Sequence, residues 1–287
     1  MLLKTGNSRT VIEGEKALKI GNRQFDTEHD CSIMGILNVT PDSFSDGGKW
    51  NSLDKALKHA QDMAEEGAAI LDIGGESTRP GHVQISIQEE IDRVVPVIEA
   101  VKKEFDIPIS IDSYKSEVVE AALKAGADLV NDIWGLKYDR RVADLIAEWK
   151  VPCCLMHNRN QADYTDFLTE MCQDMEESVK IAREAGIADS QIILDPGVGF
   201  GKTYENNLAA IHHLERLCAL GFPVLLATSR KSVIGMTLDL PADDRLEGTL
   251  ATTVLGVLKG ASFIRVHDVK ENLRAIRMTQ AILRESR

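Results

Sequence analysis

The chain has 287 residues, a hydrophobic content of 44% and a formal net charge of -12 at pH 7. Its length fits two average domains or one α/β barrel, and its acidity argues against a nucleic-acid or anionic-membrane surface, because no broad basic field is available to bind phosphates. The opening MLLKTGNSRT lacks the apolar stretch of a signal peptide, and no run of about 18 apolar residues follows it. We therefore expect a soluble cytoplasmic protein.

Residues 1–30 differ in pattern from the rest of the chain. They contain KALKIGNRQFDTE, in which Gly21 and Asn22 separate two short alternating runs, as in a β-hairpin. We expect this N-terminal extension to cover the floor of a single domain formed by residues 31–287.

Eight short runs rich in Ile, Val and Leu recur through that domain. They are SIMGILNV, AAILDIGG, IPISIDS, ADLVNDI, VPCCLMH, IILDPG, FPVLLATSR and SFIRVHD. Between them lie segments with helical periodicity, such as 52–67, 115–126 and 204–221, which end on glycine as a C-terminal cap would. Strands that alternate with helices pair in parallel, and eight such units favour a closed (β/α)₈ TIM barrel over an open doubly wound sheet.

The five cysteines are odd in number and form no C-x-x-C pair, so they indicate neither a disulfide framework nor a zinc site. We interpret them as free thiols. Cys153 and Cys154 are neighbours on one predicted strand and should face opposite ways.

Polar residues close every one of the eight runs, at the strand ends where the chemistry of a barrel gathers. They are Asn38, Asp72, Asp112, Asn131, Asp132, His157, Asp195, Lys231, Arg265 and His267. Each alone could be a turn or cap residue, but their recurrence favours a shared site. Because side chains alternate along a strand, we expect Asp132 and His157 to face away from the site and to have structural roles.

Two kinds of chemistry appear in this set. The side chains of Asp112, Asn131, Asp195 and Lys231 offer donors and acceptors that suit the edge of a flat heterocycle. Those of Asn38, Arg265 and His267 suit a phosphate group with a hard metal ion.

Two further motifs add to the predicted site. DPGVGFGK, at 195–202, has the spacing of neither a P-loop nor a dinucleotide fingerprint. Its glycines would let the backbone approach a flat ligand, with Phe200 available to stack, although a simple tight turn is the alternative. SRKSVIG, at 229–235, places Ser229 and Ser232 where a helix begins, and free N–H groups there bind anions such as a carboxylate.

Seven motifs, taken together and in order, resemble the signature set of the dihydropteroate synthase family. They are NVTPDSFSDGG, ILDIGGESTRPG, ISIDSYK, LVNDIWG, LDPGVGFGK, TSRKSVIG and IRVHDV. The resemblance implies a folate-pathway transferase that condenses 6-hydroxymethyl-7,8-dihydropterin pyrophosphate with p-aminobenzoate, giving 7,8-dihydropteroate and pyrophosphate. Sulfonamides mimic the second substrate, so the resemblance also implies a sulfonamide target, although the sequence does not fix how sensitive it is.

The same resemblance assigns roles to the site residues. Catalysis would involve Asp72, Asp112, Asp195, Lys231, Arg265 and His267. The pterin would contact Asp112, Asn131, Met156, Asp195, Phe200 and Lys231, while Asn38 would ligate Mg²⁺ and Arg265 and His267 would hold the pyrophosphate. p-Aminobenzoate and two closing loops would involve Asp42, Phe44, Asp46, Ser77, Thr78, Arg79, Pro80, Ser229 and Ser232.

Three alternatives stay open on the sequence. A pterin-binding methyltransferase barrel would share the strand-end acids but would not need SRKS, or Arg265 with His267. A Schiff-base aldolase would use Lys231 as its nucleophile. A non-catalytic pterin-binding homologue is the third. The apolar segment TLATTVLGVLKGA suggests a homodimer contact, although packing on the barrel would explain it equally well.

Overall fold

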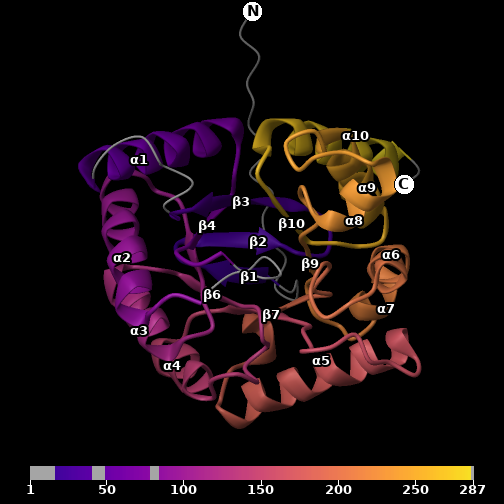
Figure 1. Cartoon of the computed structure of the whole chain (residues 1–287), viewed down its shortest axis with the longest axis horizontal. Helices are drawn as coiled ribbons and strands as arrows, with labels where there is room; N and C mark the ends of the chain where they lie inside the picture. The colour runs from indigo at the N-terminus through magenta and orange to yellow at the C-terminus, as the bar shows by residue number, and fades with distance from the viewer. Residues whose placement is uncertain (1–16, 41–48, 78–83, 286–287) are drawn as a thin grey trace, which may run out of the picture.

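The structure is a computed structural model that describes residues 17–40, 49–77 and 84–285. Eight parallel strands form a ring, and helices surround it (Figure 1). The predicted (β/α)₈ barrel is confirmed. Among the helices in these ranges, none has the length and apolar character needed to cross a membrane.

The strands of the ring follow the eight apolar runs. They are β3 (Ser32–Asn38), β4 (Ile70–Gly74), β5 (Ile109–Asp112), β6 (Leu129–Asp132), β7 (Cys153–Met156), β8 (Ile192–Asp195), β9 (Leu225–Leu226) and β10 (Phe263–Val266). Their order is β8-β7-β6-β5-β4-β3-β10-β9, and a parallel bridge between Leu194 and Val224 closes the ring from β8 to β9. β9 is much shorter than its apolar run, since the chain leaves the sheet and turns through Arg230, whose φ is 56°.

The helices follow the strands as the alternating pattern predicts. They are α1 (Lys49–Glu66), α2 (Ile87–Glu104), α3 (Ser116–Ala125), α4 (Arg141–Trp149), α5 (Phe167–Glu184), α6 (Tyr204–His212), α7 (Leu214–Cys218), α8 (Ser232–Leu238), α9 (Leu246–Leu258) and α10 (Val269–Glu285). A 3₁₀ turn, η2 (Asp189–Gln191), precedes β8. The segment 204–221 is two helices, because the backbone leaves helical geometry at His213 (φ -109°, ψ 32°).

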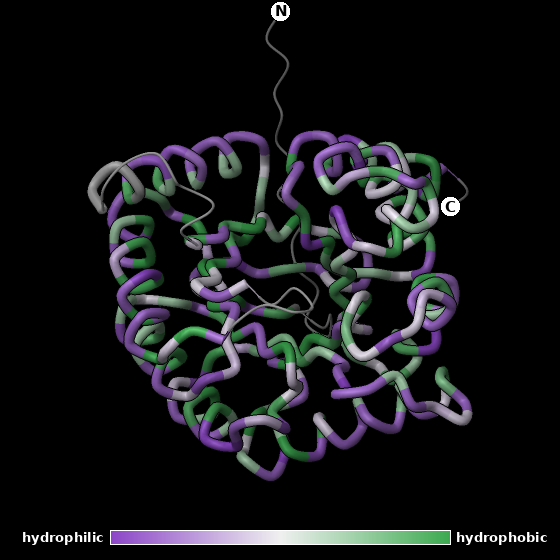
Figure 2. Tube along the Cα trace, viewed as in Figure 1, coloured by the Kyte–Doolittle hydropathy of each residue, from purple (hydrophilic) through white to green (hydrophobic). Residues whose placement is uncertain are grey.

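Two apolar layers use opposite faces of the strands. The larger layer lies between strands and helices and contains Cys153, whereas Cys154 belongs to a layer inside the barrel. The two thiols therefore face opposite ways, as predicted. Figure 2 shows the hydrophobic residues gathered along the strands and the inward sides of the helices, with hydrophilic residues outside.

An antiparallel hairpin, β1 (Ala17–Ile20) and β2 (Arg23–Asp26), supplies the end of the inner layer. Its turn uses Gly21, whose φ of 58° favours glycine. Leu18, Ile20 and Phe25 pack with the first inward residues of the barrel strands, and the Phe25 and Phe263 ring centroids lie 5.5 Å apart. The hairpin thus seals the floor of the barrel and leaves the carboxyl ends of the strands as its mouth.

Candidate active site

A cluster of charged and amide side chains lies at the carboxyl ends of four strands. Arg265 on β10 donates from Nε to Asp72 Oδ2 at 2.5 Å and from Nη2 to Asp112 Oδ2 at 2.6 Å. Asn131 Nδ2 also donates to Asp72 Oδ2, at 3.2 Å. The fold therefore brings together four predicted site residues from distant parts of the sequence.

Asp72 lies deeper than its motif indicated. The sequence placed it where the strand ends, but β4 continues to Gly74 and the Asp72 side chain is fully buried. A buried carboxylate costs several kcal/mol without partners, and the contacts with Arg265 and Asn131 offset that cost. Asp72 is thus a wall residue of the barrel interior that holds Arg265 in place.

The carboxyl groups of this cluster are electrostatically strained. Burial raises the pKa of Asp112 to about 7, and the neighbouring Asp72 adds to the effect while Arg265 opposes it. Asp72 Oδ1 and Asp112 Oδ1 are buried and have no hydrogen-bond partner within the described part of the chain. Two carboxylates thus share one guanidinium, and each keeps one oxygen with the capacity to accept a hydrogen bond from a ligand.

Asp195 and Lys231 both contact the backbone of the glycine-rich loop 195–202. Asp195 Oδ1 accepts a hydrogen bond from Gly197 N at 2.7 Å, while Lys231 Nζ donates to the Val198 carbonyl oxygen. Lys231 Nζ also lies 4.7 Å from the centroid of the Phe200 ring. Burial lowers the pKa of Lys231 to about 8 and raises that of Asp195 above its usual range.

An apolar wall joins these polar groups. Met156 and Phe200, both predicted, pack with Tyr114, Ile133 and Trp134. The last three follow the predicted acids and amides within ISIDSYK and LVNDIWG. The sequence reasoning used the polar residues of those motifs and missed the aromatic ones, which their position just past a strand end would have indicated.

Asn38, Ser229 and His267 complete the described part of the mouth. A Cβ at Gly74 would lie 3.8 Å from Asn38 Oδ1 and 3.6 Å from Asp112 Oδ2, so Asn38 and Asp112 face the same point. Ser229 Oγ lies 2.9 Å from His267 Nδ1 and accepts from the His267 backbone N–H at 3.2 Å. This contact joins the chain after β9 to the end of β10.

Other predicted residues have different positions. Ser232 and Ser77 are exposed, and neither has a contact that would define a role. Asp132 accepts hydrogen bonds from the backbone N–H groups of Trp134 and Leu136, both at 2.8 Å, as a turn residue does. The lid candidates Asp42, Phe44, Asp46, Thr78, Arg79 and Pro80 lie outside the described residues.

A buried ion cluster that the sequence reasoning missed lies beside the mouth. Lys115 Nζ is 2.6 Å from Glu76 Oε2 and 2.8 Å from Glu90 Oε2, and all three side chains are buried. Tyr114 donates its hydroxyl hydrogen to Glu76 Oε1 at 2.9 Å, and Ile85 donates its backbone N–H to Glu76 Oε2 at 3.2 Å. The cluster ties the segments after β4 and β5 to α2.

The donor set at the mouth is suited to a hard cation. Within the described ranges no three His, Cys, Asp or Glu side chains form a metal cluster. Mg²⁺, however, takes one or two protein oxygens and completes its shell with water and substrate phosphates. The amide oxygen of Asn38, which lies near the Asp112 side chain beside Gly74, fits that mode of binding.

The comparisons with known proteins identify the family of this chain. A family model described as "Pterin binding enzyme" matches residues 34–267. A dihydropteroate synthase of Clostridium beijerinckii is 56% identical over 268 residues, covering 93% of this chain and 100% of that protein. A dihydropteroate synthase of Bacillus subtilis is 58% identical over 251 residues, covering 88% of each chain.

Solved structures give the same result. A dihydropteroate synthase from Clostridium difficile, crystallised in the presence of pteroic acid, has a TM-score of 0.89 at 52% identity and covers 91% of this chain and 99% of its own. One from Xanthomonas albilineans with 4-aminobenzoic acid has a TM-score of 0.89 at 40% identity, covering 94% and 98% respectively. The chain therefore belongs to the pterin binding enzymes and, within them, to the dihydropteroate synthase family.

Proposed function

We propose that this chain is a transferase that joins 6-hydroxymethyl-7,8-dihydropterin pyrophosphate to p-aminobenzoate at the barrel mouth. The products are 7,8-dihydropteroate and pyrophosphate. The observation that carries this proposal is the convergence of Asp72, Asp112, Asn131 and Arg265 in one cluster, within a chain whose relatives are dihydropteroate synthases.

The pterin ring would bind between Asp112 and Asn131 on one side and Asp195 and Lys231 on the other. The ring edge presents N–H donors and a carbonyl acceptor. The buried oxygens of Asp112 and Asp195 accept from such donors, and Asn131 and Lys231 supply donors. The faces of the ring would pack on Met156 and Phe200, which belong to the apolar wall.

Bond cleavage would leave positive charge on the pterin methylene and negative charge on pyrophosphate. The electron-rich ring spreads the positive charge, and the carboxylate of Asp195 stabilises it. Arg265 uses two of its five N–H groups on Asp72 and Asp112, so three are available to the leaving group, beside His267. Asn38 would hold Mg²⁺, which when bound supplies further positive charge against pyrophosphate.

p-Aminobenzoate would approach from the side of α8. Its aniline nitrogen is already neutral at pH 7, so attack on the methylene needs no strong base. Ser232, at the exposed first turn of α8, would bind the carboxylate, and the stem of Lys231 would cover the ring.

One assay tests the function directly. Pyrophosphate release is measured from 6-hydroxymethyl-7,8-dihydropterin pyrophosphate with and without p-aminobenzoate and Mg²⁺. We expect one pyrophosphate per dihydropteroate, and release that depends on both additions. Release that is indifferent to p-aminobenzoate would indicate a hydrolase of the pterin pyrophosphate and would contradict the proposal.

We also propose that the chain forms a homodimer through α9 and α10. Leu258, Met278 and Ile282 are 54–61% exposed on these two helices, which pack on one another. Large exposed apolar side chains on neighbouring helices are typical of an interface between copies. Sedimentation should give about twice the monomer mass of 31.6 kDa, and the double change Met278→Glu/Ile282→Glu should give the monomer.

A further inference from the structure

The loop 195–202 lies directly on the chain that follows β7. Gly197 has a φ of 67°, and a Cβ there would lie 1.9 Å from the His157 carbonyl oxygen. Gly201 has a φ of 51°, and a Cβ there would lie 2.3 Å from the Arg159 carbonyl oxygen. The two backbones therefore touch at positions where only glycine fits, and the position of the loop is set by residues 157–159.

Lys202 crosses this junction. Its Nζ lies 3.0 Å from the Phe200 carbonyl oxygen, 3.3 Å from the His157 carbonyl oxygen and 2.8 Å from His157 Nδ1. Burial lowers the pKa of Lys202 to about 7, and in its ammonium form the group has three N–H donors for the three acceptors around it. Lys202 is thus a clamp between the loop and the end of β7.

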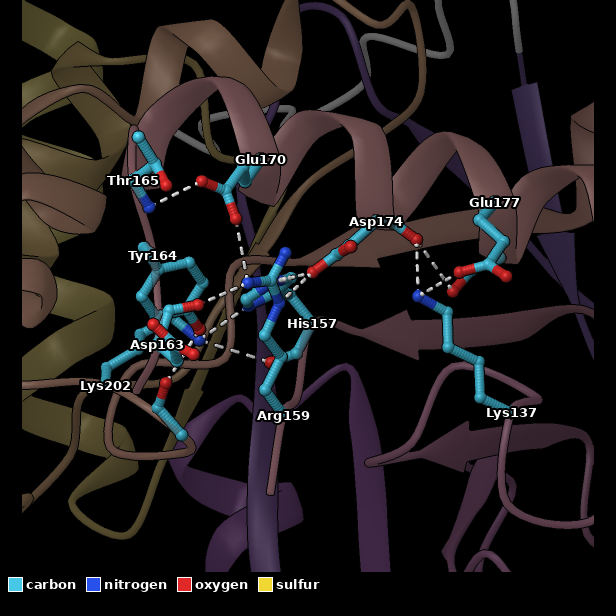
Figure 3. A network of polar contacts seen from close by, with 12 residues as sticks. Lys137, His157, Arg159, Asp163, Tyr164, Thr165, Glu170, Asp174, Glu177 and Lys202 are labelled. Atoms are coloured by element: carbon cyan, nitrogen blue, oxygen red, sulfur yellow. Dashed lines mark hydrogen bonds and ion pairs between the residues drawn. The ribbon is translucent and has the colours of Figure 1, made fainter. Parts of the chain in front are cut away.

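The acceptor at His157 is itself fixed. The His157 ring is buried, and burial lowers its pKa to about 4, so the imidazole is neutral at pH 7. His157 Nε2 lies 3.0 Å from Asp174 Oδ2 and donates to this carboxylate, which leaves Nδ1 as an acceptor for Lys202. Arg159 Nε holds Asp174 Oδ2 at 2.6 Å (Figure 3).

The other end of the clamp reaches the candidate active site. Lys202 binds the carbonyl of Phe200, whose ring faces Lys231 Nζ. The same loop offers the Val198 carbonyl to Lys231 and the Gly197 N–H to Asp195. A shift of the loop would therefore displace Phe200 and the two backbone groups that meet Lys231 and Asp195.

We infer that Lys202 is a positioning residue for the pterin substrate, because it clamps the loop 195–202 to His157 and so fixes Phe200 against Lys231. This inference rests on the proposed function, since it assumes that the pterin lies between these groups. Lys202 acts through the loop and does not touch the reacting atoms. Its loss should weaken pterin binding while it leaves the p-aminobenzoate side of the mouth unchanged.

Lys202→Met tests the inference, because it keeps a long side chain and removes all three donors. Calorimetry with pteroic acid and steady-state kinetics are the readouts. We expect about tenfold weaker binding of pteroic acid and a similar rise in KM for dihydropterin pyrophosphate. KM for p-aminobenzoate, at saturating pterin substrate, should change less than twofold.

Lys137→Met is the matched control. Lys137 donates to the Asp174 carbonyl at 2.8 Å and pairs with Glu177 at 3.0 Å, so it belongs to the same network through α5 and not through the loop (Figure 3). Its loss should leave pterin affinity within twofold of the wild type. Equal weakening by both variants, in step with lost thermal stability, would reduce Lys202 to a structural role.

Three further outcomes are decisive. A folded Lys202→Met chain with wild-type affinity for pteroic acid would overturn the inference. If Lys202→Met does not fold, Lys202→Gln retains two donors and should show a smaller loss of affinity in the same assay; wild-type affinity there would overturn it equally. Failure of the wild-type chain to bind pteroic acid would instead count against the proposed function.

Discussion

The same strands supply the floor and the mouth of this barrel. The two contributing residues on each strand are two positions apart. On β4, β6, β8 and β10 the first inward residue is apolar and the second is polar. The pairs are Ile70 and Asp72, Leu129 and Asn131, Ile193 and Asp195, and Phe263 and Arg265. One step along the alternating face of a strand thus separates a packed layer from a charged one.

The two layers are stabilised by different kinds of contact. The floor residues are stabilised by apolar packing, and the hairpin side chains Leu18, Ile20 and Phe25 complete that layer. The mouth residues depend on one another's charge, and Asp72 and Asp112 still keep one unpartnered oxygen each within the described residues. Stability of the fold is therefore concentrated at the floor, while the mouth holds groups whose charge only a ligand completes.

Arg265 should show the largest effect, because it serves both the fold and the chemistry. Arg265→Met leaves two buried carboxylates without a cation, which should lower the free energy of unfolding by about 3–5 kcal/mol. Turnover should also fall about a thousandfold, or about 4 kcal/mol, since leaving-group charge is no longer neutralised. Urea unfolding and pyrophosphate release measure the two effects.

A double variant separates these two losses. Arg265→Met/Asp72→Asn removes one carboxylate along with the cation, so part of the lost stability should return while turnover stays low. An Arg265→Met chain with normal turnover would rule out the assignment of Arg265 to the leaving group.

Phe263→Ala should lower stability and leave the chemistry unchanged. Phe263 is fully buried at the floor against Phe25, and deletion of such a ring costs about 3–5 kcal/mol. Turnover per folded molecule should stay within twofold of the wild type, because no mouth residue loses a contact. A tenfold fall in kcat under conditions where the variant is folded would show that floor and mouth are coupled.

The sequence indicated both layers but not the contacts between them. The eight apolar runs predicted the barrel, and the polar residues at their ends predicted which side chains would meet. Periodicity could not show that Arg265 would bind Asp72 and Asp112, because those partners lie 193 and 153 residues away. For the same reason Asp72 was expected at a strand end beside some polar group, and its actual partners were not identified.

The glycine-rich loop shows the same limit. Its glycines indicated a close backbone approach, and Phe200 was expected to stack, but Lys202 was not singled out. Its partner His157 belongs to another motif, 45 residues away, and was expected only to be a structural residue. A lysine next to a glycine turn has many possible partners, and only the packed fold selects one.

Asp112→Asn should weaken the pterin site without a loss of stability. The change keeps the shape of the side chain and removes the charge that accepts donors from the ring edge. We expect about thirtyfold weaker binding of pteroic acid by calorimetry, or about 2 kcal/mol. Unchanged affinity would count against a ring-edge role for Asp112.

The pH dependence of stability offers a finer distinction between the two layers. Burial raises the pKa of Asp112 from 3.8 to about 7 in the folded chain. The folded state then holds this proton more tightly than the unfolded state does. The stability that results is fully present below about pH 4 and is lost as the pH rises through about 7.

Asp112→Asn removes this titration, whereas Phe263→Ala leaves it in place. Between pH 5 and pH 8, the wild type and Phe263→Ala should lose stability in parallel, and Asp112→Asn should lose less, by on the order of 2–3 kcal/mol. Urea unfolding at several pH values measures these slopes. Three parallel curves would mean that Asp112 keeps its charge in the folded chain, so that Arg265 neutralises both carboxylates and the mouth is as well satisfied as the floor.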